Sequence, residues 1–106
     1  MIPPSRSVGI SLEAQYLYRN ALDLKTNGKK EDALKYLNLA VTVDPRFSKA
    51  YNMMGDCLDE MGRYEEAIKK YEKILNLNPE NKEVRFKLEL VQKKTRYVET
   101  ISPTGL

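Results

Sequence analysis

The chain has 106 residues, of which 42% are apolar and 31% are charged, and its formal net charge is +3. This fits one globular domain, and so small a positive charge does not require nucleic acid or a membrane as partner. There is no histidine and only one cysteine, Cys57, which excludes histidine-based catalysis and an internal disulfide. One thiol and no apolar run of membrane-spanning length together predict a cytoplasmic protein.

The spacing of apolar residues predicts a series of helices, because they recur at steps of three and four, as in Leu17, Ala21 and Leu24. Gly28 and Gly62 are placed to end the first helix of each pair, since glycine takes the left-handed conformation cheaply. In chain order we expect an irregular lead-in at 1–10, helices at 11–26, 30–43, 48–61, 64–77 and 81–97, and a flexible tail at 99–106.

The same pattern occurs twice, because shifting the chain by 34 residues aligns Ala33 with Ala67 and Pro45 with Pro79. Each copy reads as helix, short turn, helix and stop, since proline cannot continue a helix. The small residues predict close approach of the paired helices. The expected organisation is a first repeat at 11–45, a second repeat at 46–79 and a C-terminal capping helix at 80–98.

The second copy, KAYNMMGDCLDEMGRYEEAIKKYEKILNLNP, resembles a tetratricopeptide repeat. Ile74 departs from the small residue that this family has late in its second helix, and the first copy is a weaker match. The positions that carry the resemblance are Tyr51, Met54, Gly55, Leu58, Gly62, Tyr64, Ala67, Tyr71 and Pro79.

The resemblance implies an all-α solenoid, a right-handed superhelix of helix pairs with a concave groove for peptides or protein segments and no catalysis. Groove side chains are expected on the face of each first helix that points away from its partner helix. The alternative interpretation of that face is a solvated surface with incidental apolar members. The expected partner-binding residues are Tyr18, Arg19, Leu22, Lys49, Asn52, Met53, Asp56, Phe86, Lys87 and Leu90.

Some members of the family bind chaperone C-termini through basic and amide side chains that clamp carboxylates. Of the positions aligned with that clamp, only Lys87 has suitable chemistry, and Glu83 would repel a carboxylate. We therefore expect no specific binding of such tail peptides. An acidic cluster around Asp56 and Asp59 faces a basic one that includes Lys87 and Lys94, which predicts either mutual screening or a polar frame for a ligand.

These observations predict a non-catalytic protein–protein interaction module that binds a peptide or helix of a partner protein. The alternative is a structural unit that forms a homodimer through its last helix, where Phe86, Leu90 and Tyr97 mark a second apolar face. A helical-repeat RNA binder is disfavoured by the 34-residue period and the acidic groove segment. No nucleic acid, membrane, metal or cofactor is expected, and no nucleophile stands beside an evident base, which argues against an enzyme.

Overall fold

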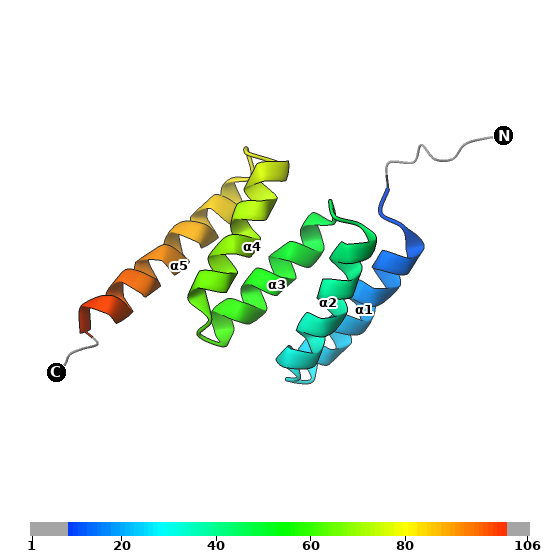
Figure 1. Cartoon of the computed structure of the whole chain (residues 1–106), viewed down its shortest axis with the longest axis horizontal. Coiled ribbons are helices and arrows are strands. Elements are labelled where there is room, and N and C mark those ends of the chain that lie inside the picture. The colour runs from blue at the N-terminus through cyan, green and yellow to red at the C-terminus, as the bar shows by residue number, and fades with distance from the viewer. Residues whose placement is uncertain (1–8, 102–106) are drawn as a thin grey trace. The chain divides into compact units, whose positions relative to one another are not determined.

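The computed structural model describes residues 9–101, with side chains through Tyr97, and this part of the chain has five α-helices and no strand (Figure 1). The helices are α1 (Leu12–Thr26), α2 (Lys30–Val43), α3 (Ser48–Glu60), α4 (Tyr64–Leu77) and α5 (Lys82–Ile101). The predicted all-α fold is confirmed. Helix α5 continues to Ile101, beyond the expected start of the tail at 99. The remainder of the expected tail, 102–106, and most of the lead-in, 1–8, lie outside the described residues.

Two compact units make up the chain, and they divide between Ala50 and Tyr51. In the first unit, α1 and α2 pack against each other as an antiparallel hairpin (Figure 1). Ala21 on α1 and Ala33 on α2 are fully buried, as their spacing predicts. Small side chains at these positions allow the two backbones to approach closely. Leu37 is the largest side chain of this unit that is fully buried.

The second unit contains α3 from Tyr51 onward, together with α4 and α5. Gly55 of α3 lies directly against the ring of Tyr71 on α4, so these helices meet where the sequence provides its smallest residue. Ala67 is fully buried, as expected. Helix α5 packs on α4 and buries Val84 and Val91, which lie on one face of that helix.

The same turn closes both helix pairs. Gly28 and Gly62 have φ angles of 81° and 79°, the left-handed conformation that their positions predict. The backbone N–H of Lys29 donates to the Leu24 carbonyl at 2.8 Å, and that of Arg63 donates to Leu58 at 2.8 Å. Further backbone bonds of 2.9 and 3.0 Å involve the two glycines themselves. These bonds form the Schellman motif, which satisfies carbonyls that the end of a helix leaves without partners.

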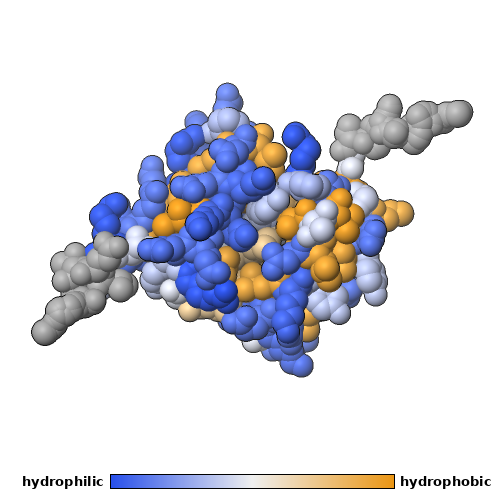
Figure 2. Space-filling model, in the orientation of Figure 1, coloured by the Kyte–Doolittle hydropathy of each residue, from blue (hydrophilic) through white to orange (hydrophobic). Residues whose placement is uncertain are grey.

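No helix in the described part of the chain is both long and apolar enough to cross a membrane. Several apolar side chains are nevertheless exposed. In the first unit, Figure 2 shows apolar side chains gathered over α1 and α2, where Leu12, Leu39 and Val43 are exposed.

Candidate functional site

The first unit contains a cleft of about 580 Å³ beside α1. Its walls come from the segment before α1, from one face of α1, and from the start of α3 with the residue that precedes it. The lining residues are Ile10, Gln15, Tyr18, Arg19, Leu22, Phe47 and Lys49.

Hydrogen bonds at the start of α1 fix one wall of the cleft. The Ser11 hydroxyl accepts from the backbone N–H of Ala14 at 3.1 Å, which is the usual role of serine at a helix N-terminus. The backbone N–H of Ser11 donates to Asp44 Oδ2 at 3.2 Å. Gln15 Nε2 donates to the Ile10 carbonyl oxygen at 2.7 Å. The chain before α1 is therefore held to α1 and to the residue that follows α2, and Ile10 is placed in the cleft wall.

Two aromatic rings form the apolar part of the cleft. Tyr18 and Phe47 have ring centroids 5.3 Å apart with an interplanar angle of 43°, a tilted arrangement of the kind that aromatic pairs prefer. Phe47 is only 4% exposed, so it anchors the wall. Leu22, one turn beyond Tyr18, is exposed and extends the apolar surface.

The charge of the cleft is positive. Lys49 Nζ lies 5.7 Å from the centroid of the Tyr18 ring, within the range of a cation–π interaction. Arg19 contributes the second cation, and no lining residue is acidic. Among the described residues, neither Arg19 nor Lys49 forms an ion pair. The cleft therefore combines an apolar wall with two cations that have no internal counter-ion.

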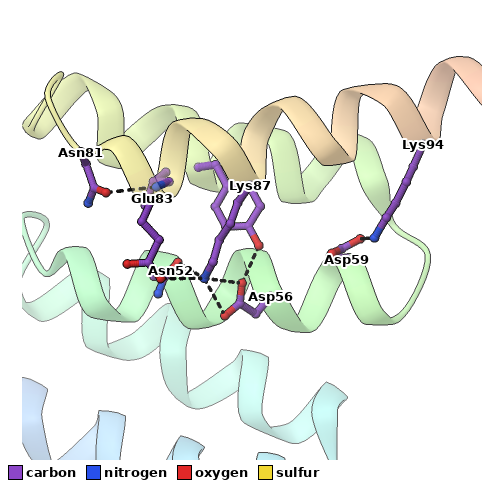
Figure 3. A network of polar contacts seen from close by, with 9 residues as sticks. Asn52, Asp56, Asp59, Asn81, Glu83, Lys87 and Lys94 are labelled. Atoms are coloured by element: carbon purple, nitrogen blue, oxygen red, sulfur yellow. Dashed lines mark hydrogen bonds and ion pairs between the residues drawn. The ribbon is translucent and has the colours of Figure 1, made fainter.

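A polar network in the second unit joins α3 to α5 (Figure 3). Lys87 Nζ donates to Asn52 Oδ1 at 3.1 Å and to Asp56 Oδ1 at 3.2 Å. The Tyr71 hydroxyl donates to the same Asp56 oxygen at 2.5 Å. Glu83, although 3.9 Å from Lys87 Nζ, is mostly exposed. Asp56 thus accepts from both α4 and α5, and its charge is compensated within the unit.

A second ion pair lies further along the same helices. Lys94 Nζ is 2.8 Å from Asp59 Oδ1 and 5.7 Å from the centroid of the Tyr64 ring. The hydrogen bond to Asp59 raises the pKa of Lys94. The pKa of Tyr71 is raised strongly, first by burial and then by its hydrogen bond to Asp56. Mutual screening of the acidic and basic clusters, one of the two interpretations from the sequence, is confirmed for these two pairs.

The predicted partner-binding residues fall into three groups. Tyr18, Arg19, Leu22 and Lys49 line the cleft of the first unit. Asn52, Asp56 and Lys87 are bound to one another in the second-unit network. Phe86 and Leu90 are exposed on α5, at 62% and 42%.

The expectation that Met53 presents its side chain to a groove is wrong, because Met53 is 8% exposed. Its helical neighbours on the same face, Ala50 and Cys57, are fully buried. Residues three and four positions apart share a helix face, so Met53 is buried with them.

Sequence reasoning did not identify Phe47 and Ile10 as parts of the cleft. Neither lies within a predicted helix, so the periodicity that placed the other residues gives no information about them. The only hint in the sequence was that Phe47, a large aromatic residue, stands directly before the expected start of a helix at residue 48. Its equivalent in the next repeat, 34 residues on, is Asn81, so the repeat pattern gave no warning.

Comparison with known proteins places this geometry in a family. The family model described as "Tetratricopeptide repeat" matches residues 48–81. The chain is 33% identical over 66 residues to the "Small glutamine-rich tetratricopeptide repeat-containing protein 2" of Mycosarcoma maydis, covering 62% of this chain and 19% of that protein. It is 32% identical over 75 residues to a "DnaJ homolog subfamily C member 7 homolog" of Dictyostelium discoideum, covering 71% of this chain and 14% of that protein.

Among solved structures, the fold is similar to the Sgt2 TPR domain from Aspergillus fumigatus, with a TM-score of 0.75 and 25% identity. That similarity covers 88% of this chain and 63% of the other. The chain thus spans less than a fifth of the length of the two curated relatives. The matched repeat, the relatives and the shared fold agree with the glycine, alanine and proline positions of the sequence, and the chain is a tetratricopeptide-repeat protein.

Proposed function

We propose that the chain is a non-catalytic protein-interaction module that binds a peptide segment of a partner protein in the cleft of the first unit. Tetratricopeptide repeats are generally modules of this kind, and the Mycosarcoma maydis relative is named for such repeats within a much longer protein. The observation that carries the proposal is the cleft itself, in which exposed apolar surface lies beside two cations without counter-ions.

The lining suggests which peptide chemistry fits. Tyr18, Leu22 and Phe47 offer contact to an aliphatic or aromatic side chain. Arg19 and Lys49 would attract an acidic side chain beside it, and Arg19 can bind a carboxylate through two parallel hydrogen bonds. The ligand that best matches the cleft is therefore a segment with an apolar residue flanked by Asp or Glu.

Selection from a random peptide library, with amidated C-termini, tests this proposal on the whole chain. We expect enrichment of peptides that pair an apolar residue with an acidic one. The double variant Arg19→Glu/Lys49→Glu should bind a selected peptide at least ~10-fold more weakly, because attraction becomes repulsion. The matched control, Lys69→Glu/Lys82→Glu, changes the net charge equally at exposed lysines of the second unit and should bind as wild type does. Equal weakening by both double variants would overturn the proposal.

A second candidate function is self-association through α5. The exposure of Phe86 (62%), Leu90 (42%) and Tyr97 (65%) on this one helix favours it. Grouped exposed apolar side chains are typical of contact surfaces, whereas single ones are not.

A further inference from the structure

Three exposed apolar residues of α5, with one lysine among them, lie in a row along one face of the helix. Phe86, Leu90, Lys93 and Tyr97 are separated by four, three and four positions, the spacing that keeps side chains on one helix face. We call these four residues the α5 stripe. The buried residues Val84 and Val91 occupy the opposite face. The stripe therefore points away from α4, on which α5 packs.

Resting on the second candidate function, we propose that two copies of the chain pair through their α5 stripes as antiparallel helices. If the two-fold axis crosses the helix pair at the level midway between residues 91 and 92, Phe86 of one copy lies beside Tyr97 of the other. The same axis also brings Leu90 beside the aliphatic stem of Lys93. Both ends of the contact then hold an aromatic pair, which adds attraction beyond the buried area.

Charge complementarity with a second copy comes from the residues that flank the stripe. Glu89 and Arg96 lie seven positions apart on the same flank, and both are exposed. In the antiparallel arrangement, Glu89 of each copy faces Arg96 of the other, which gives two equivalent ion pairs. Flanking charges of this kind set the partner and orientation of paired helices.

The other flank carries Lys87 and Lys94, which would face each other across the pair as like charges. Both are already neutralised within their own copy, because Lys87 Nζ lies 3.2 Å from Asp56 and Lys94 Nζ lies 2.8 Å from Asp59 (Figure 3). The polar network thus removes a repulsion that would otherwise oppose pairing on this side.

A parallel arrangement fits less well. It would place Lys93 of one copy directly against Lys93 of the other, in the middle of the stripe. It would also separate Glu89 from Arg96. The antiparallel pairing keeps the two Lys93 side chains apart and brings Glu89 of one copy beside Arg96 of the other. We therefore assign the antiparallel orientation.

Sedimentation equilibrium on the whole chain tests the inference. Since the stripe is small beside the ~1,200 Å² of a stable interface, we expect a weak dimer of the 12.2 kDa chain, with a Kd of roughly 10–100 µM. Glu89→Arg alone, or Arg96→Glu alone, should weaken self-association ~10-fold or more, because each change turns two ion pairs into two like-charge contacts. Mixing the two variants should restore association, because each then finds its complement in the other.

The matched control is Glu72→Arg, the same charge reversal at an exposed position of α4, which should leave the dimer unchanged. Circular dichroism of each variant establishes that the helices remain formed. A wild-type chain that stays monomeric at all accessible concentrations would overturn both self-association and this pairing. A wild-type dimer that Glu89→Arg does not weaken, or that mixing does not restore, would overturn the antiparallel register alone. Neither result bears on peptide binding in the first unit.

Discussion

The ring of Tyr71 occupies the space that a side chain on Gly55 would need. A Cβ built on Gly55 would lie 2.5 Å from Cε1 and 2.8 Å from Cζ of that ring. The ring is held in place, because its hydroxyl donates to Asp56 and its side chain is 1% exposed. Glycine is therefore required here for packing.

We expect Gly55→Ala to destabilise the chain. Overpacking costs about 1–3 kcal/mol, whereas the better helix propensity of alanine returns about 1 kcal/mol, so the unfolding free energy should fall by up to ~2 kcal/mol. Urea unfolding measures it. The same change in a Tyr71→Leu background should cost less, because the ring is gone. An equal cost in both backgrounds would contradict the packing explanation.

The two aspartates of the second-unit network should differ in their contributions to stability. Asp56→Ala leaves the Tyr71 hydroxyl and the Lys87 amine without their shared carboxylate, and both groups are partly buried. Such a loss costs about 1–3 kcal/mol. Asp59→Ala removes a pair whose lysine is 47% exposed, and exposed pairs contribute only ~0–1 kcal/mol.

Thermal unfolding of both variants beside wild type checks the order of these effects. Asp56→Asn serves as a control, because its amide oxygen still accepts from Tyr71 while the charge is lost. The unfolding temperature of Asp56→Asn should lie between those of wild type and Asp56→Ala. An Asp59→Ala variant as unstable as Asp56→Ala would contradict the prediction that the more buried pair contributes more to stability.

Stability should decrease at alkaline pH through Tyr71. Its pKa is raised in the folded chain by burial and by Asp56, whereas an unfolded tyrosine ionises near pH ~10. The unfolded chain therefore releases this proton first, so the stabilisation is fully present below pH ~10 and is lost as the pH rises towards the folded pKa. Urea unfolding from pH ~8 to ~11 should show that the free energy of unfolding decreases less with pH for Tyr71→Phe than for wild type. Identical declines would contradict the prediction.

A terminal carboxylate should gain no affinity from Lys87. The Lys87 amine is already bound by Asn52 and Asp56, and Glu83 adds a negative charge 3.9 Å away. For an acidic peptide, we expect calorimetry to give equal affinities for the free-acid and amidated forms. Lys87→Ala should leave both unchanged. Micromolar binding that needs the free carboxylate and disappears in Lys87→Ala would establish a carboxylate clamp instead.

The helical framework could be predicted from the sequence because it depends on local rules. Periodicity gave the helices, and the left-handed glycines and buried alanines were found where the repeat put them. The end of α5 was missed because no glycine or proline stops the helix before Ser102.

The candidate site could be predicted only in part, because its chemistry depends on residues far apart in sequence. Helical spacing placed Tyr18 and Arg19 on one face, but it could not show that Phe47 closes that face into a cleft. It also placed Asp56 and Lys87 on facing helices without indicating that they bind each other across 31 positions. Met53 was misplaced because α3 buries more than one face, whereas the prediction assumed a single buried stripe.

The Schellman turns at Gly28 and Gly62 have a consequence for engineering. Each turn is closed by backbone atoms and one glycine, and the side chains of Lys29 and Arg63 do not cap the helix that follows. The two connectors should therefore be interchangeable, so that grafting Asn27–Lys29 onto Met61–Arg63 yields a hairpin with the original topology. Residues at these corners are suited to carry labels or surface attachments that would disturb folding elsewhere in the molecule.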